Sequence, residues 1–427
     1  MVVNILLILL AKFIFYFSRL FNIGSGGTWP GEVALRLNKS ILISFLNQAN
    51  KGVIIVAGTN GKTTTSKMIS ELLTGTVIKN YSGANLLNGL VSAFIINCSL
   101  TGKIVVDWAV LEVDENTLPL LLPELIEYDK KLIIVLLNLF RDQLDRYGEV
   151  DTIAKRWEKS LMNMPKATLI LNADDPQIAY LGATSNAIVK YFGIEKPEHF
   201  LESREHAVDS IYCPKCGNKL IFEGIYLSHI GVWACTKCGL KRPTIEKHSW
   251  ISPLLGIHNE YNTIASVTVA LEAGVDKERI EKILSTFLPA FGRQETIEIE
   301  GKKVKIMLAK NPAGFNINLK TIIKQNPKTL LVVLNDRIPD GHDVSWIYDV
   351  DFEMIPDDVT VIVSGDRVYD MGLRIKYAMK HLIVKENLRE AIQKGLSEII
   401  KGETLYVLPT YSAMLEVRKI LKGRKIL

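Results

Sequence analysis

Short apolar runs alternate with amphipathic stretches along most of the chain, a pattern that predicts parallel strands joined by helices. Segments 63–73 and 260–273 have the apolar spacing of helices. Each apolar run ends in glycine or polar residues, as at the ligand-binding edge of a doubly wound sheet, so we predict an α/β fold. The runs typical of buried strands are 52–57, 104–112, 132–137 and 169–171.

The alternation stops between about 200 and 250 and resumes near 300, which indicates an insertion followed by a second α/β unit. The second unit is predicted to contain strands 329–334, 359–363 and 404–408 and helices 386–400 and 411–421. We therefore divide the chain into an N-terminal helix with its lead-in, a central domain with an insertion, and a C-terminal α/β domain. The predicted boundaries are 1–39, 40–296 (insertion at about 205–248) and 297–427.

The composition, net charge and cysteine count agree with a globular α/β protein. A hydrophobic content of 48% and a charged content of 23% in 427 residues are typical of a globular protein. The net charge of +5 is too small to make nucleic acid the expected partner. Five cysteines are too few for a disulfide scaffold, and four of them form two Cys-x-x-Cys pairs, which favours a reducing, cytoplasmic compartment.

The N-terminal segment from Val2 to Phe21 is strongly apolar, but Lys12 interrupts it. Its longest uncharged run, residues 1–11, is shorter than the roughly 20 residues of a membrane span, and no secretory signal is evident. On a helix its polar residues share one sector. The helix either packs on its own domain or lies in the membrane interface, with Lys12 and Arg19 facing anionic head groups. A transmembrane span is a third alternative.

A phosphate-binding loop is the most informative motif. The loop follows a predicted strand and opens a helix, so its backbone N–H groups and the helix N-terminus can hold an anion. Lys62 can reach the β- and γ-phosphates, and the Thr63 hydroxyl can hold Mg²⁺. Val56 stands where the standard motif has its first glycine, so this is a shortened variant. The residues assigned to ATP are Gly58, Thr59, Asn60, Gly61, Lys62, Thr63 and Thr64.

A neighbouring strand should supply an acidic residue to the metal. Glu112, at the end of the predicted strand 104–112, is the candidate second magnesium ligand beside Thr63. Asp114 and Glu115 are interpreted as charges at the start of a helix.

Four segments in series resemble the Mur ligases, ATP-dependent enzymes that activate a carboxylate as an acyl phosphate. The resemblance covers residues 40 to 295 and implies that Asn259 and Asn262 lie against the adenine and that Arg293 lies near the end of the ATPase domain. The similar segments are 58–64, 141–148 (Arg-Asp-Gln-Leu-Asp-Arg-Tyr-Gly), 172–176 (Asn-Ala-Asp-Asp-Pro) and 256–262 (Gly-Ile-His-Asn-Glu-Tyr-Asn).

One departure from the family concerns a second magnesium site. Mur ligases have a histidine where Gln143 stands, and a carbamylated lysine about 14 or 15 residues later. That position falls on Trp157 or Glu158 here, with Lys155 and Lys159 only nearby. The sequence therefore leaves the second magnesium site open.

The two Cys-x-x-Cys pairs predict a metal site. Cys213 and Cys216 are separated by 18 residues from Cys235 and Cys238, a spacing that lets four thiolates surround Zn²⁺ at about 2.3 Å. Four thiolates leave no position for water, so the zinc is expected to be structural. Residues 213–248 contain six basic and two acidic residues, a charge too small, once the thiolates are counted, to favour nucleic acid.

The C-terminal domain lacks the Asp-Tyr-Ala-His-Asn-Pro segment of ordinary Mur ligases. Its segments 308–316 (Leu-Ala-Lys-Asn-Pro-Ala-Gly-Phe-Asn) and 340–349 (Asp-Gly-His-Asp-Val-Ser-Trp-Ile-Tyr-Asp), with the four cysteines, instead resemble the MurT family. MurT proteins are the ligase subunits of lipid II isoglutaminyl synthase and work as heterodimers with a GatD glutamine amidotransferase.

This resemblance implies ATP-dependent amidation of the D-glutamate α-carboxylate of lipid II in peptidoglycan synthesis, at the inner face of the cell membrane. Ammonia would come from the GatD-type subunit, since Cys98, the one unpaired cysteine, shows no nucleophile motif and is expected to be packed and inert. The family implies that Asp343 orients the glutaminase histidine across the interface, with Asp349 as the alternative. The segment Lys310-Asn311-Pro312 is expected to lie beside the acyl phosphate.

The sequence also fits two other classes of protein. An amino-acid-adding ligase of the Mur or folylpolyglutamate type would incorporate an amino acid and need no partner. A P-loop NTPase could use the zinc ribbon to hold nucleic acid.

Overall fold

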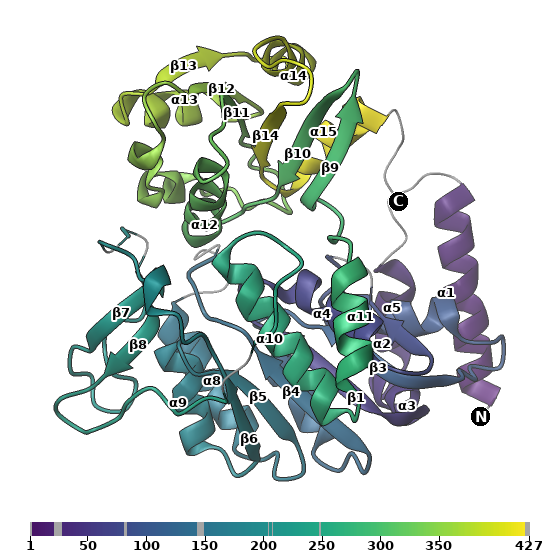
Figure 1. Ribbon diagram of the computed structural model, residues 1–427. Helices are drawn as coiled ribbons and strands as arrows, with labels where there is room; N and C mark the ends of the chain where they lie inside the picture. The colour runs from purple at the N-terminus through teal and green to yellow at the C-terminus, as the bar shows by residue number, and fades with distance from the viewer. Residues whose placement is uncertain are drawn as a thin grey trace.

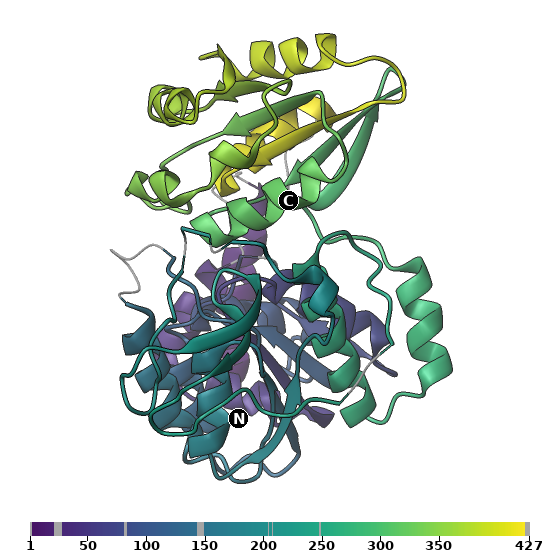
Figure 2. The ribbon, with the colours of Figure 1, turned by 60° about the vertical axis from the view of Figure 1, so that its left-hand side comes forward.

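The computed structural model describes residues 2–20, 28–80, 83–142, 149–203, 205–206, 208–246 and 249–422. It has two lobes, one above the other, each built around a six-stranded sheet (Figures 1 and 2). The α/β fold predicted from the sequence is confirmed in both lobes, because buried parallel strands alternate with helices in each.

The central lobe contains an all-parallel sheet. Apolar residues fill both faces of β1 (Ala49–Ala57), so that Val53 and Ile55 face one core and Ile54 and Val56 face the other, all four fully buried. Later strands of the sheet lie on both sides of β1, so the strand order reverses at this strand. In α/β sheets, ligands bind at the carboxyl end of the strands at such a switch point. The strand order is β2 (Val77–Lys79), β3 (Val106–Glu112), β1 (Ala49–Ala57), β4 (Lys131–Leu136), β5 (Thr168–Asn172) and β6 (Ile188–Phe192).

Helices cover both faces of the central sheet. One face packs against α4 (Lys62–Leu72), α10 (Ile257–Glu272) and α11 (Lys277–Thr286). The opposite face packs against α2 (Trp29–Leu37), α3 (Ile41–Leu46), α5 (Leu87–Asn97), α6 (Leu118–Leu121), α8 (Val150–Leu161) and α9 (Pro176–Thr184).

The C-terminal lobe repeats the architecture with one antiparallel strand. Its sheet has the order β13 (His381–Val384), β12 (Thr360–Ser364), β11 (Thr329–Val333), β14 (Thr404–Pro409), β10 (Lys302–Met307) and β9 (Arg293–Ile299), and β9 pairs antiparallel with β10. Helices α12 (Pro312–Ile323) and α13 (Val368–Tyr377) cover one face, and α14 (Leu388–Ser397) and α15 (Tyr411–Lys422) the other. The predicted boundary between residues 296 and 297 falls inside β9.

The insertion forms a small antiparallel unit beside the central lobe. Strands β7 (Ile221–Leu227) and β8 (Ile230–Ala234) pair with each other and with no other named strand in the described chain. The cysteine pairs lie before β7 and directly after β8.

Helix α1 (Val2–Leu20) lies along the outside of the central lobe, against α2 and α5 (Figure 1). This packing agrees with the alternative of a helix packed on its own domain. The membrane-interface alternative placed Lys12 at the head groups, which the structure contradicts, because the side chain is buried and Nζ donates to the carbonyl oxygen of Ile96 at 3.3 Å. The side chain of Arg19 lies outside the described residues. The outward face is apolar instead, and its exposed side chains are Leu6, Leu9, Leu10, Phe13, Tyr16 and Phe17.

The transmembrane alternative for α1 finds no support in the structure. Among the described residues, no helix combines the length and apolarity needed to cross a bilayer.

Candidate functional site

The phosphate-binding loop connects β1 to α4 at the carboxyl edge of the central sheet. Gly58 and Gly61 have φ angles of +136° and +93°, which side chains disfavour. A Cβ on Gly61 would lie 2.2 Å from Oδ1 of Asn262 on α10, so the loop and α10 can approach this closely only with glycine here. The loop is also tied to the segment that follows β4, because the Asn60 N–H donates to Oδ1 of Asn138 at 2.8 Å.

Lys62 is buried at the start of α4 and its ammonium faces the loop. Nζ donates to the carbonyl oxygen of Thr59 at 3.2 Å and pairs with Oε2 of Glu115 at 3.2 Å. Burial opposes ionisation of Glu115, but the positive charges of Lys62 and Lys310 outweigh it and lower the Glu115 pKa. The interpretation of Glu115 as a helix-start charge is wrong, since α6 begins only at Leu118 and the carboxylate lies at the phosphate loop.

Thr63 and Glu112 are brought together. The Thr63 hydroxyl donates to Oε1 of Glu112 at 3.1 Å, and both side chains are buried. Asn80 fixes the end of β3 by exchanging two 2.9 Å hydrogen bonds with the Glu112 backbone. A hydroxyl and a carboxylate oxygen at this distance are the donor set that Mg²⁺ prefers in phosphate sites. These residues therefore fit a magnesium ion at the end of the loop.

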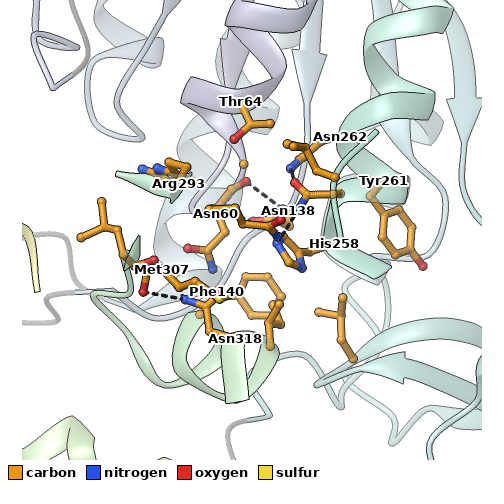
Figure 3. Close-up of a pocket in the computed structure, with 18 of the residues that line it drawn as sticks. Asn60, Thr64, Asn138, Phe140, His258, Tyr261, Asn262, Arg293, Met307 and Asn318 are labelled. Carbon is orange, nitrogen blue, oxygen red and sulfur yellow. Dashed lines mark hydrogen bonds between the residues drawn. The ribbon is translucent and has the colours of Figure 1, made fainter. Parts of the chain in front are cut away.

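A cavity opens beside the phosphate loop, between the two lobes (Figure 3). Thr64, Asn259, Asn262 and Arg293 line it, as does His258. The amides form a chain, because Asn262 accepts from Thr65 at 3.3 Å and donates to Asn259 at 3.0 Å. Burial, together with the charge of Arg293, lowers the pKa of His258 to about 4, so this imidazole is neutral at physiological pH.

The insertion and the C-terminal lobe complete this cavity. Leu227 and Ile230, at the turn between β7 and β8, supply apolar wall, and Gly314, Ile317 and Asn318 of α12 close another side. Sequence reasoning missed both contributions because they come from units that share no motif with the phosphate loop.

Two residues before α12 link the C-terminal lobe directly to the loop. Asn311 caps α12 by accepting from Gly314 N–H at 2.8 Å, and its Nδ2 donates to Oδ1 of Asn60 at 3.2 Å. The neighbouring Lys310 ammonium forms an ion pair with the buried carboxylate of Asp142. Burial raises the Asp142 pKa despite this lysine.

Trp157 occupies the region where Mur ligases have their carbamylated lysine. Its indole is fully buried, and Nε1 donates to the backbone carbonyl of Glu115 at 2.8 Å. Lys155 and Lys159 lie on the exposed side of α8. Gln143 lies outside the described residues. The tryptophan thus holds the Glu115 loop by its backbone, and neither nearby lysine faces the site.

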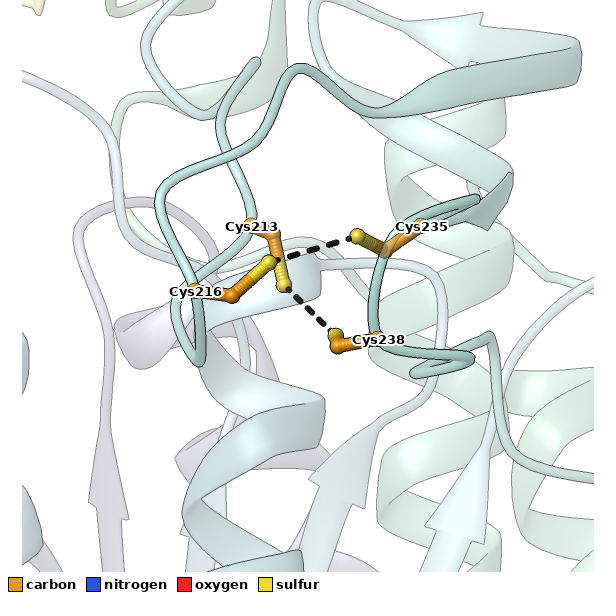
Figure 4. Close-up of side chains that lie close together, drawn as sticks. All are labelled: Cys213, Cys216, Cys235 and Cys238. Carbon is orange, nitrogen blue, oxygen red and sulfur yellow. Dashed lines mark hydrogen bonds between the residues drawn. The ribbon is translucent and has the colours of Figure 1, made fainter.

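The four cysteines of the insertion converge (Figure 4). Their sulfur atoms all lie within 4.8 Å of one another, with 3.6 Å between the sulfurs of Cys213 and Cys238 and 3.5 Å between those of Cys216 and Cys235. Backbone N–H groups of Cys238 and Lys237 lower the pKa of Cys235 to about 6. Four sulfurs at these distances fit the tetrahedral coordination of one Zn²⁺ ion.

Asp174, in the 172–176 segment, anchors the insertion. It accepts from Arg242 Nε at 2.5 Å and from the Tyr261 hydroxyl at 2.6 Å, and Trp233 donates to the carbonyl of Ala173 at 3.0 Å. Burial raises the pKa of Asp174 in spite of the arginine. The insertion is therefore fixed to β5 and α10, close to the cavity it helps to line.

The two candidate interface aspartates differ. Asp343 is exposed, and its pKa is lowered by hydrogen bonds from the Ser345 side chain and from the Ser345 N–H, the latter at 2.8 Å. Asp349 is already engaged within the chain, since its Oδ2 lies 3.4 Å from Nη1 of Arg141.

Cys98 is buried, and burial raises its thiol pKa, as expected for a packed cysteine.

The sequence matches the Mur ligase middle domain over residues 56–270 and the MurT ligase C-terminal domain over residues 308–414. Two solved structures share the fold. A pseudomurein peptide ligase type C from Methanothermus fervidus aligns with a TM-score of 0.64 at 23% identity, covering 87% of this chain and 79% of that one. MurF from Acinetobacter baumannii aligns with a TM-score of 0.62 at 18% identity, covering 92% and 80%.

The fold, the phosphate loop and these matches define a Mur ligase. Among curated relatives, the MurT subunit of the lipid II isoglutaminyl synthase (glutamine-hydrolyzing) of Streptococcus pneumoniae is 33% identical, over 96% of this chain and 95% of the relative. The subunit of the same name from Staphylococcus aureus strain COL is 34% identical over 92% of both chains. The chain belongs to the MurT family.

Zinc content tests the cysteine cluster. We expect about one equivalent of zinc per chain, and we expect Cys216→Ser to lose it, because three thiolates bind more weakly than four. Loss should also lower the melting temperature and weaken ATP binding, since Leu227 and Ile230 depend on this unit. Metal analysis, thermal unfolding and calorimetric titration with ATP measure these three effects. Cys98→Ser is the matched control and should keep its metal; equal metal content in all three proteins would contradict the assignment.

Proposed function

We propose that this chain is the ligase subunit of a lipid II isoglutaminyl synthase. It amidates the α-carboxylate of D-glutamate in the lipid II stem peptide, during peptidoglycan synthesis. The observation that carries the proposal is the similarity to the pneumococcal subunit, which extends over 95% of that protein and so includes both lobes. The nucleotide cavity between those lobes supports it, because amide formation from a carboxylate needs activation.

The reaction has two steps. A carboxylate oxygen attacks the γ-phosphorus of ATP, ADP leaves, and an acyl phosphate forms. The lone pair of ammonia then attacks the acyl carbon, inorganic phosphate leaves, and the nitrogen loses a proton. Mg²⁺ would neutralise charge on the phosphates during the first step.

Different residues around the loop bind different parts of ATP. The loop N–H groups from Gly58 to Thr64 hold the phosphates, and Lys62 meets the charge that develops on them. Thr63 and Glu112 would hold the magnesium ion. The adenine lies against Asn259 and Asn262. Arg293, at the start of β9 in the C-terminal lobe, lines the same cavity.

Ammonia must come from a partner. A glutaminase needs an activated cysteine, but Cys98 is buried with a raised pKa and the remaining four cysteines form the metal cluster. The partner is a GatD-type glutamine amidotransferase, bound as a heterodimer. Asp343 orients its histidine, because this carboxylate is exposed and keeps a low pKa, whereas Asp349 is engaged by Arg141.

The protein works at the inner face of the cell membrane, where ATP and a lipid-linked substrate meet. The exposed apolar face of α1 supports this location. It carries three aromatic rings, Phe13, Tyr16 and Phe17, which are side chains typical of the membrane interface. The buried Lys12 ties the helix to the lobe and leaves this face outward.

Removing the Lys62 ammonium tests the nucleotide site. We expect Lys62→Ala to weaken ATP binding roughly 100-fold, because a buried charge-assisted contact to phosphate is lost. Isothermal titration calorimetry measures the affinity. Lys166→Ala, an exposed lysine away from the cavity, should bind ATP like the wild type. Unchanged affinity of the Lys62 variant would refute the assignment.

Nitrogen donors discriminate the proposed reaction from amino-acid addition. With ATP and lipid II, we expect amidation from ammonium salt by the chain alone, and from glutamine only after the glutaminase is added. Asp343→Asn should lose the glutamine-driven rate at least tenfold and keep the ammonium-driven rate, while Asp358→Asn keeps both. Mass spectrometry of the product decides: incorporation of an amino acid excludes the proposal, and equal loss of both rates excludes the role of Asp343.

Vesicle binding tests the outward face of α1. We expect the double variant Phe13→Glu/Phe17→Glu to lose most co-sedimentation with phosphatidylglycerol-containing vesicles. Two negative charges then replace aromatic rings that the membrane would bury. Ile338→Glu, an exposed apolar position in the C-terminal lobe, is the control and should bind like the wild type. Equal sedimentation of all proteins would rule out this face as the membrane-binding surface. A change in oligomeric state without loss of vesicle binding would assign it to protein contact instead.

A further inference from the structure

The turn of the insertion's hairpin is buried, although connecting turns usually lie in solvent. Ser228 and His229 form the two-residue connection between β7 and β8, and they are 1% and 0% exposed. Ser228 has a φ of +49°, a conformation that residues other than glycine rarely adopt. Its N–H donates to the carboxylate of Glu205, which helps to hold the turn in this conformation. A polar turn that is both buried and strained points to a specific contact inside the central lobe.

The imidazole of His229 makes that contact. Its ring is tilted against the ring of Phe140, with 4.9 Å between the centroids, and its Nδ1 lies 3.3 Å from Oγ of Ser228. The second nitrogen, Nε2, has no hydrogen-bond partner among the described residues, and Oδ2 of Asp175 lies 3.5 Å from it. Because His229 and Asp175 are both fully buried, water does not screen the attraction between the nitrogen and the carboxylate.

Asp175 connects this nitrogen to the segment that follows β4. Oδ1 caps α9 by accepting from the N–H groups of Gln177 and Ile178 at 3.0 and 3.3 Å. Oδ2, the oxygen that faces His229, accepts from the Leu139 N–H at 2.9 Å. The same carboxylate oxygen therefore contacts His229 and Leu139, so that a nitrogen attracting this oxygen keeps it in place for the backbone of the central lobe.

The segment 138–140 carries the phosphate loop. Thr59 exchanges two hydrogen bonds with the Phe140 backbone, since its hydroxyl donates to the carbonyl oxygen at 3.1 Å and accepts from the N–H at 3.0 Å. Asn138 exchanges two more with the Asn60 backbone, at 2.8 and 3.0 Å. The Thr59 N–H also donates to the carbonyl oxygen of Asn138 at 2.9 Å. The direction of the loop N–H groups therefore depends on where this segment lies.

We propose that His229 is a positioning residue for the phosphate loop and that it acts through Asp175. The insertion places His229, and His229 holds the Asp175 carboxylate. Asp175 in turn holds Leu139, and the segment 138–140 carries the loop. His229 is not among the residues that line the nucleotide cavity, so its effect on ATP passes through these contacts. The inference rests on the proposed function only in taking ATP as the ligand of the loop.

Two substitutions at His229 test the contact with Asp175 in the full chain. His229→Phe keeps a ring against Phe140 and removes Nε2, so we expect the Kd for ATP to rise about fivefold. His229→Gln loses the ring but keeps a side-chain N–H at similar reach, so its Kd should stay within twofold of the wild type. Tyr226→Phe is the matched control. It removes a buried hydroxyl of the same insertion, which donates to the carbonyl oxygen of Ile194 at 2.8 Å, and should bind ATP like the wild type. Isothermal titration calorimetry measures all four affinities.

Hydrogen exchange of the protein without nucleotide separates this inference from the proposed function. We expect the amides of Leu139 and of residues 58–64 to exchange faster in His229→Phe, and at the wild-type rate in His229→Gln and Tyr226→Phe. If the wild type binds no ATP, the nucleotide assignment is wrong and the exchange rates still decide the role of His229.

Three results would overturn the inference. The first is a His229→Phe protein with the affinity and exchange rates of the wild type. The second is a raised Kd in His229→Gln, since the ring rather than Nε2 would then position the segment; this result is decisive even where His229→Phe does not fold. The third is an equal loss of ATP affinity in Tyr226→Phe, which would reflect a general loosening of the insertion.

Discussion

A short series of alternating charges joins the two lobes at the phosphate loop, and the site depends on it. Lys62 pairs with Glu115 at 3.2 Å, and Lys310 of the C-terminal lobe pairs with Asp142 while also lowering the Glu115 pKa. Removing one member would leave a buried charge without compensation, which costs several kcal/mol. Any anion that engages Lys62 also competes with Glu115 for the same ammonium. Charge therefore connects the phosphate loop to the second lobe in this structure.

Local patterns were sufficient to predict the fold and the frame of the site. The apolar run before Gly58 predicts β1, and the polar residues after each strand predict the edge where ligands bind. Spacing alone predicted that the four cysteines would converge. These features are predictable because each is set by residues close in sequence, through the periods of strand and helix or the reach of a Cys-x-x-Cys turn.

Contacts between distant segments escaped prediction. Glu115 lies 53 positions from Lys62, and its sequence neighbourhood is typical of a helix start, so nothing local indicates the pairing. For α1 the pattern was clear but its orientation was not. Periodicity defines two faces of a helix and leaves open which face packs, and here the carbonyl of Ile96 gives Lys12 a buried partner. The six exposed apolar side chains follow from that one hydrogen bond together with the packing of Leu7 and Ile8.

The position of the cysteine insertion favours a structural part in nucleotide binding over nucleic-acid recognition. Arg242, which is less exposed than the described lysines of the insertion, pairs with the buried Asp174 at 2.5 Å, so it cannot also neutralise a phosphate backbone. The turn between β7 and β8 instead places Leu227 and Ile230 in the wall of the cavity beside the phosphate loop. A two-stranded sheet is marginally stable alone, and a metal ion linking its two flanking turns would hold that turn in place. The insertion thus acts through the shape of the cavity, which three separate units of the chain close around the phosphate loop.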